Sequence, residues 1–420
     1  MRDTIESTRR GRRVDAREGA RRPGRRWLRR LAAGMLGLVV LVAAVYGWAW
    51  ASVDSSTTAR AMIWLGADVG DQDRFPARAI PAGDDAGPLP EGEEIDLSAA
   101  VPEGTGGGGG FDDHLRATGT LALLVVHDDR LVYERYFDGS DRRTRQTSFS
   151  VAKSFVSTLV GIAIEEGLIG SVDDPITDDI PELAERDPRY ERITLGHLMT
   201  MSSGLRYEEQ SIPVLPWGDD IETYYGVDLR EAALESTEIV GTPGLEFIYN
   251  NYNPLLLGLV LERATGMTVS RYMATRLWQP LGAEGDATWS LDSESSGFEK
   301  MESGLNATPV DFARFGQLFL HGGRWNDTRL VSEDWVRAAT GADVRTDPAS
   351  HYQYFWWVDL ERPGRFYALG NFGQYIYVAP DADTVIVRLG RDWGAENQTW
   401  LATFRDVADE LARSGRMDAT

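Results

Sequence analysis

The chain has 420 residues, of which 42% are hydrophobic and 13 are Trp, a composition typical of a folded protein with a sizeable core. It contains no cysteine, which excludes a disulfide framework and a thiolate nucleophile. The net charge of −22 is unevenly distributed, because residues 1–30 hold twelve Arg and only four acids. The acidic remainder argues against nucleic acid as a partner.

The N-terminal 51 residues have the pattern of a membrane anchor. Residues 1–30 are polar and Arg-rich, and we expect them to form a disordered cytoplasmic tail. Residues 31–51 are uncharged, and as a helix they would span ~31 Å, about the thickness of the hydrocarbon core of a bilayer. The arginines before this run and the aromatic residues near its end predict a single-pass helix with the rest of the chain periplasmic or extracellular. A cleaved signal peptide is the alternative, since residues 49–51 resemble a small-x-small cleavage site.

Residues 52–110 show no durable periodicity and are rich in proline and acidic residues, so we expect a linker. The glycine run at 106–110 lacks the Lys-Ser/Thr ending of a phosphate-binding loop and is interpreted as a flexible spacer. We expect the folded domain to cover residues 111–412.

The hydrophobic pattern of that domain predicts an α+β fold. Two β-branched and aromatic runs, at 120–126 and 131–137, are typical of a hairpin. A mostly helical middle follows, and strand patterns return at 354–358, 365–369, 374–378 and 384–389, before a final helix from about residue 397. We therefore expect one antiparallel sheet built from both ends of the domain and flanked by helices, with an inserted helical subdomain.

The segment from Ser150 to Lys153 carries the first chemical signal. It precedes a buried-helix pattern over residues 154–169, and positions three apart lie on one helix face, so the Lys153 amine would lie beside the Ser150 hydroxyl. A helix N-terminus also favours the serine alkoxide. This Ser-x-x-Lys arrangement occurs in active-site serine acyltransferases, although the four-residue pattern alone also fits a helix cap followed by a surface lysine.

Further motifs follow in a fixed order. They are Ile193–Thr200 with Ser202–Leu205, Pro243-Gly244 with Phe247–Asn253, Gly304–Thr308, and Ala368–Tyr375. Together with Ser150 and Lys153, this set resembles the serine β-lactamase-like family, which includes class C β-lactamases, D-alanyl-D-alanine carboxypeptidases, family VIII esterases and 6-aminohexanoate-dimer hydrolases. The residues around Gly304 and Trp356-Trp357 are most similar to the branch of the 6-aminohexanoate-dimer hydrolases.

The resemblance implies Ser150 as the nucleophile, Lys153 as its helix neighbour, and Tyr249 with Asn251 as the Tyr-x-Asn element. Serine needs a base to attack an ester or amide. Lys153 can be that base if burial or a second positive charge depresses its pKa; alternatively, a charged Lys153 holds Tyr249 as the phenolate base. Tyr249 would return the proton to the leaving group, and Asn251 would orient Lys153 or the substrate.

The last motif departs from the β-lactamase pattern. Where β-lactamases carry Lys-Thr-Gly, this chain has Ala368-Leu369-Gly370, without a charge or hydroxyl for a substrate carboxylate. The strand end Gly370-Asn371 would still supply a backbone N–H that forms an oxyanion hole with that of Ser150. Poor β-lactam recognition is therefore expected, unless another cation such as Arg365 or Arg388 replaces the lysine.

No metal-ligand spacing or cofactor motif is present in the sequence, and we expect none to be used. The sequence thus predicts a membrane-anchored serine hydrolase that cleaves small esters or amides through an acyl-enzyme on Ser150. The alternatives are a D,D-peptidase or β-lactamase-type enzyme and a catalytically silent ligand-binding member of the fold. The pattern leaves the oligomeric state open.

Overall fold

The computed structural model describes residues 24–84, 86–100, 110–209, 217–341 and 349–418. The chain divides into two compact units, Met1–Ala51 and Ser52–Thr420. Within the first unit, helix α1 (Gly24–Ala51) contains a stretch, Arg29–Ala51, that is long and apolar enough to cross a membrane; a signal sequence would have the same properties. The helix begins at Gly24, so the end of the expected disordered tail is helical, while residues 1–23 lie outside the described part of the chain.

A seven-stranded antiparallel sheet forms the centre of the second unit. Its strand order is β3-β2-β13-β12-β11-β10-β9. The strands are β2 (Thr120–His127), β3 (Arg130–Tyr136), β9 (Tyr352–Gln353), β10 (Trp356–Val358), β11 (Phe366–Gly370), β12 (Gln374–Ala379) and β13 (Thr384–Gly390). The predicted hairpin β2–β3 pairs with β13, so the sheet is built from both ends of the domain. The α+β prediction is confirmed.

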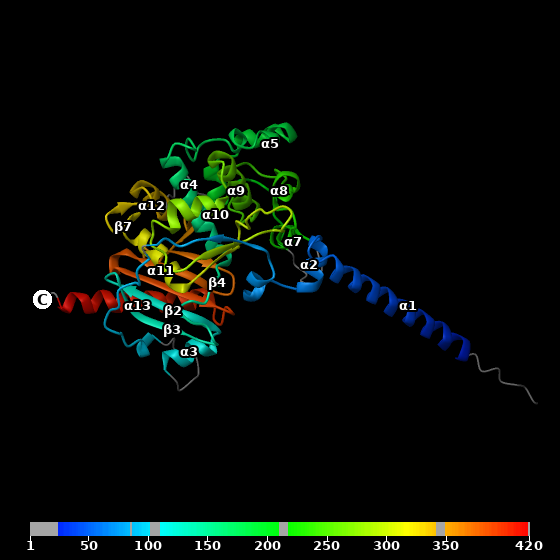
Figure 1. The fold of residues 1–420 in the computed structure, drawn as a ribbon, viewed down its shortest axis with the longest axis horizontal. Coiled ribbons are helices and arrows are strands. Elements are labelled where there is room, and N and C mark those ends of the chain that lie inside the picture. The colour runs from blue at the N-terminus through cyan, green and yellow to red at the C-terminus, as the bar shows by residue number, and fades with distance from the viewer. Residues whose placement is uncertain (1–23, 85, 101–109, 210–216, 342–348, 419–420) are drawn as a thin grey trace, which may run out of the picture. The chain divides into compact units, whose positions relative to one another are not determined.

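Helices cover both faces of this sheet (Figure 1). Because side chains alternate along a strand, Leu123 and Val125 of β2 point to one face and Leu124 and Val126 to the other. The first pair packs with the terminal helix α13 (Asn397–Asp418) and with α3 (Phe111–Ala117). The second pair belongs to the larger core, which includes α4 (Ala152–Glu165) and α11 (Pro309–Leu320). Burial on both faces explains why β2 is a continuous apolar run.

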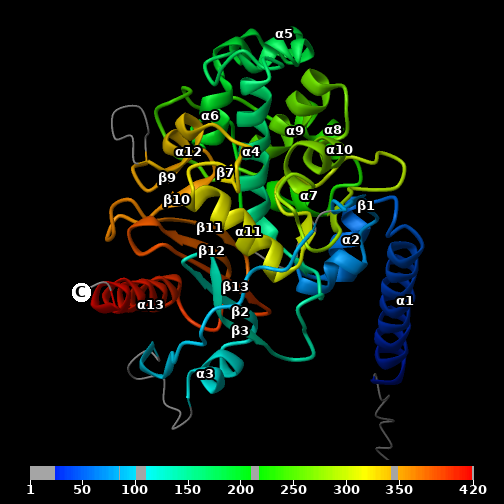
Figure 2. The same ribbon diagram turned by 60° about the vertical axis from the view of Figure 1, so that its left-hand side comes forward.

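The helical subdomain lies between the two sets of strands in sequence and contains α9 (Tyr252–Thr265) and α10 (Val269–Met273), which pack beside α4 (Figure 2). Shorter helices complete the mostly helical middle of the chain. They are α5 (Pro181–Arg186), α6 (Leu195–Met199), α7 (Asp219–Tyr225), α8 (Leu229–Glu231) and α12 (Glu333–Thr340).

The expectation of a linker over residues 52–110 is wrong for the residues that the structure describes. Helix α2 (Thr57–Trp64) and strand β1 (Ala77–Ile80) belong to the same compact unit as the domain. Strand β1 pairs with β5 (Ala287–Ser290) in a second sheet of order β1-β5-β6-β4, completed by β6 (Leu305–Ala307) and β4 (Gln146–Thr147). A four-residue strand in a proline-rich context has too little periodicity to be recognised without its partner. The glycine run at 106–109 lies outside the described residues.

Candidate active site

Ser150 lies in a short 3₁₀ turn, η3 (Phe149–Val151), that leads directly into α4. The turn follows the edge strand β4, and Ser148 N donates to Leu305 O of β6 at 2.8 Å, so the second sheet holds the residue preceding this turn. Lys153 is the second residue of α4, whereas Ser150 lies in the preceding 3₁₀ turn, so the two residues do not share a regular α-helical turn. The predicted juxtaposition nevertheless occurs, because Lys153 Nζ lies 2.8 Å from Ser150 Oγ.

Lys153 is fully buried, and its partners are neutral. Besides Ser150 Oγ, its amine donates to the backbone carbonyl of Glu302 at 2.8 Å. Burial lowers the pKa of Lys153 to about 7; the negative charge of Glu302 acts in the opposite direction, and the positive charge of Lys300 adds to the decrease. An amine with such a pKa is largely able to accept a proton at neutral pH.

Tyr249 lies close enough to Ser150 to be influenced by its hydroxyl, and Lys153 Nζ lies 5.0 Å from the centre of the Tyr249 ring. Burial raises the pKa of the Tyr249 hydroxyl; the Ser150 side chain acts in the opposite direction, and the negative charge of Glu209 adds to the increase. This environment favours the neutral phenol over the phenolate. The ring is held by aromatic contacts with Tyr352 and Trp357, at centroid distances of 6.0 and 6.1 Å.

Asn251 lies just before α9, and its amide donates from Nδ2 to the Tyr207 hydroxyl at 2.7 Å. Its Oδ1 atom is buried and has no hydrogen-bond partner among the described residues. Asn251 was expected to orient either Lys153 or the substrate; in the described part of the chain the Lys153 amine donates to Ser150 and Glu302 and not to Asn251. A free buried acceptor is available for a donor that is brought by a substrate.

The end of β11 meets the nucleophile turn at Gly370. A Cβ at this position would overlap the carbonyl oxygen of Ser148 and lie 3.2 Å from the Cβ of Phe149, so only glycine allows the approach. Asn371 is the next residue, so this approach brings the end of β11 close to the turn that contains Ser150. An oxyanion hole formed by the backbone N–H groups of Ser150 and Asn371 requires such proximity. Phe149 has a φ of +44°, a strained conformation for an L-residue, and its ring packs on that of Phe372 at 5.2 Å.

Neither of the two arginines considered as substitutes for the missing β-lactamase lysine is free to act. Arg365 is paired with Asp381 at 2.7 Å and with Asp409 at 2.5 Å. Arg388 is fully buried and donates to backbone carbonyls of Thr118 and Gly373. Both guanidinium groups therefore have structural partners.

Two residues next to the site were missed in the sequence. Lys300 and Glu302 form a buried ion pair of 2.8 Å, and the side chains of both are at most 2% exposed. In the sequence both residues belong to a charged run directly before Ser303-Gly304. Such a run is typical of an exposed turn. Only the position of this run next to the motif around Gly304 could have indicated from the sequence that Lys300 and Glu302 lie near the active site.

Comparisons with known proteins show which proteins this chain is similar to. The family model for beta-lactamase matches residues 111–403. The 6-aminohexanoate-dimer hydrolase of Paenarthrobacter ureafaciens is 28% identical over 367 residues, covering 81% of this chain and 88% of that protein. Esterase EstB of Burkholderia gladioli is 30% identical over 194 residues, covering 41% of this chain and 48% of that protein. A solved structure from Bacillus anthracis, assigned to the 6-aminohexanoate-dimer hydrolases, has a TM-score of 0.73 at 24% identity, over 84% of this chain and 97% of that one.

The fold and the site define a serine hydrolase of the β-lactamase and penicillin-binding-protein fold. The chain belongs to the beta-lactamase family, and it is homologous to the 6-aminohexanoate-dimer hydrolase.

Proposed function

We propose that this protein hydrolyses small neutral esters or linear amides through an acyl-enzyme on Ser150. The observation that carries the proposal is the contact of the Ser150 hydroxyl with a buried amine whose other partner is a neutral carbonyl. An amine in that position can take the serine proton because burial disfavours its charged form.

In the proposed reaction Lys153 removes the proton from Ser150 Oγ as this oxygen attacks the substrate carbonyl. The backbone N–H groups of Ser150 and Asn371 stabilise the oxyanion. The C–O or C–N bond then breaks, and the leaving group takes a proton from the Tyr249 hydroxyl, which recovers one from Lys153. Water attacks the acyl-enzyme with the same groups acting in reverse order, which frees the acid and restores Ser150.

The preference for neutral substrates is inferred from the strand end at Ala368-Leu369-Gly370. It offers neither charge nor hydroxyl, and Arg365 and Arg388 have other partners. The acceptor Oδ1 of Asn251 is suited to an N–H of an amide substrate. Homology to the 6-aminohexanoate-dimer hydrolase and to esterase EstB supports amides and esters as the two classes to test.

We also propose that the catalytic unit is anchored by α1, with the N-terminus cytoplasmic and residues 52–420 periplasmic or extracellular. The length and apolar composition of Arg29–Ala51 support this topology, as do the arginines that precede the helix. The full-length protein is expected to sediment with membranes and to resist a carbonate wash. Recovery of the full-length chain in the soluble cytosolic fraction would contradict the proposal, and a mature N-terminus near residue 52 would identify a signal peptide instead.

The decisive experiment treats the purified protein with a fluorophosphonate probe and locates the modified residue by peptide mass spectrometry. We expect one adduct on Ser150 and turnover of p-nitrophenyl butyrate or a short linear amide. Absence of both would identify a silent ligand-binding member of the fold, and release of D-alanine from a peptidoglycan stem peptide as the preferred reaction would identify a D,D-peptidase.

A further inference from the structure

One residue, Glu302, contacts two buried lysines in different ways. Its backbone carbonyl accepts from Lys153 Nζ at 2.8 Å, and its carboxylate Oε1 accepts from Lys300 Nζ at 2.8 Å. The carboxylate also accepts from Ser303 Oγ at 2.7 Å, while Oε2 is buried without a partner among the described residues. The ion pair is thus attached through a single residue to the amine beside the nucleophile.

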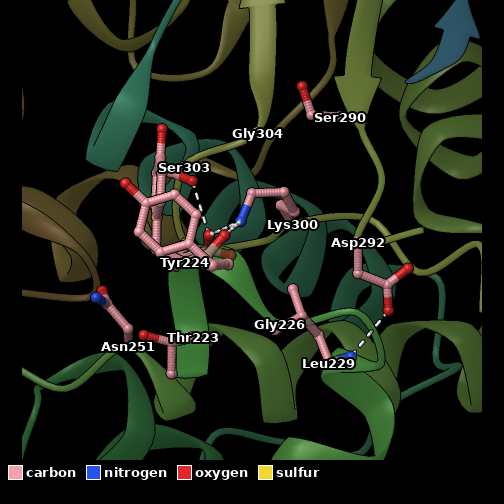
Figure 3. A network of polar contacts seen from close by, with 12 residues as sticks. Thr223, Tyr224, Gly226, Leu229, Asn251, Ser290, Asp292, Lys300, Ser303 and Gly304 are labelled. Atoms are coloured by element: carbon pink, nitrogen blue, oxygen red, sulfur yellow. Dashed lines mark hydrogen bonds and ion pairs between the residues drawn. The ribbon is translucent and has the colours of Figure 1, made fainter. Parts of the chain in front are cut away.

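The surroundings of Lys300 keep this pair out of water. The amine donates to the carbonyl of Tyr224 at 2.5 Å and lies 4.6 Å from the ring centres of both Tyr224 and Phe75. Figure 3 shows the amine directed toward Ser303 and the Tyr224 ring. An ion pair in an apolar enclosure interacts with neighbouring charges more strongly than one in water.

Part of this enclosure comes from the segment that precedes the family match. Phe75 belongs to it, and so does Arg60, which is buried and donates to the carbonyls of Gly226 and Asp292. Asp71 of the same segment accepts from the Tyr224 hydroxyl at 2.8 Å. Residues outside the matched range of 111–403 therefore complete the wall around the ion pair.

We propose that Lys300 and Glu302 are positioning residues for the reaction: the carbonyl of Glu302 holds the Lys153 amine against Ser150, and the two opposite charges of the pair balance each other beside that amine. The inference rests on the function proposed above, in which Lys153 is the base. Loss of either charge leaves the other uncompensated next to Lys153. The two losses must therefore act on Lys153 in opposite directions.

The direction of each effect follows from electrostatics. In Glu302→Gln the positive charge of Lys300 remains and disfavours a second ammonium, so Lys153 loses its proton at lower pH. In Lys300→Met the carboxylate of Glu302 remains and favours the ammonium, so Lys153 loses its proton at higher pH. Both substitutions keep the backbone carbonyl that bonds Lys153. The other charged and titratable groups that face these two lysines are unchanged in both variants: Arg60, Asp71, Glu209, Tyr224, Tyr249 and Asp292.

The experiment measures the second-order rate of fluorophosphonate labelling between about pH 5 and 9 for the full-length protein and its variants. We expect the acid limb of the profile to move down by about one pH unit in Glu302→Gln and up by about one unit in Lys300→Met. The double variant Lys300→Met/Glu302→Gln should return close to the wild type. Glu262→Gln is the matched control, because Glu262 forms a partly buried ion pair with Arg230 at 2.8 Å that does not influence Lys153.

Shifts in the same direction, or no shifts, in correctly folded variants would overturn the inference while leaving the labelling of Ser150 and the proposed function intact. If Lys300→Met does not fold, the acid limb of Glu302→Gln is compared with that of the double variant. Only Glu302→Gln has an uncompensated charge, so only its acid limb should move to lower pH. A wild-type protein that is not labelled at Ser150 would overturn both proposals.

Discussion

Two lysines, Lys153 and Lys300, are both buried, and each donates to a different part of Glu302. Lys153 meets a carbonyl and a hydroxyl, which bear no formal charge, so burial dominates and its pKa falls to about 7. Burial also lowers the pKa of Lys300, but the charge and hydrogen bond of the Glu302 carboxylate oppose it. The comparison teaches that the pKa of a buried lysine depends on the charge of the group that accepts its hydrogen bond as well as on burial.

The largest effect is expected from removing the hydroxyl that the Lys153 amine contacts. Ser150→Ala should abolish fluorophosphonate labelling and reduce ester turnover on the order of 10³-fold or more, because it deletes the attacking oxygen. Lys153→Ala and Tyr249→Phe should each be comparably damaging, and far from additive with it, since the three groups act as a unit. Near-wild-type turnover in Ser150→Ala, with an unchanged circular dichroism spectrum, would show that the reaction occurs at another site. Lys153 would then not be the catalytic base.

The lysine that β-lactamases carry at the end of the corresponding strand is absent here, where the chain has Ala368-Leu369-Gly370, and we expect this absence to disfavour β-lactam substrates. A charge-assisted hydrogen bond contributes ~1.5–3 kcal/mol, and a tenfold change corresponds to ~1.4 kcal/mol. Losing one or two such contacts should lower kcat/KM for nitrocefin by roughly one to four orders of magnitude, whereas p-nitrophenyl butyrate needs neither. Measuring both substrates on one preparation checks this. Faster hydrolysis of nitrocefin would show that another cation reaches the β-lactam carboxylate.

The pH profile tests the assignment of the base. Only the neutral amine of Lys153 can accept a proton, so the labelling rate should rise about tenfold per pH unit below pH 7 and level off above it. A lysine with the ordinary pKa of 10.5 would give a rate still rising at pH 9. That second result would mean that Lys153 remains charged at neutral pH, as in the alternative mechanism with Tyr249 as the base.

The last comparison concerns the stability of the fold and tests the aromatic residues around Lys300. Phe75 is 6% exposed and contacts the rings of Trp64 and Tyr224, so Phe75→Ala should reduce the free energy of unfolding by ~3–5 kcal/mol. Leu65→Ala, in the same segment but at a side chain 73% exposed, should change it by less than ~0.5 kcal/mol. Urea unfolding of both variants makes the comparison. Equal stability of the two variants would indicate that this segment is loosely attached, as expected from the linker predicted over residues 52–110.

The sequence by itself determined the elements that depend on neighbours along the chain. The hairpin β2–β3, the helix after Ser150 and the late strands all have the periodicity of their secondary structure, and each lies near its predicted place. The proximity of Ser150, Lys153 and Tyr249 could be predicted for a similar reason, since their motifs are short and occur in a fixed order.

Only the tertiary structure decided which charges face the nucleophile. The Lys300–Glu302 pair was hidden because a charged run has the same local pattern whether it is solvated or buried, and burial here depends on Phe75 and Tyr224, which are distant in sequence. Strand β1 was missed for the same reason, because its partner β5 lies about 200 residues away and supplies the hydrogen bonds that define it. The pKa of Lys153 is likewise a property of the enclosure and could not be read from Ser-x-x-Lys alone.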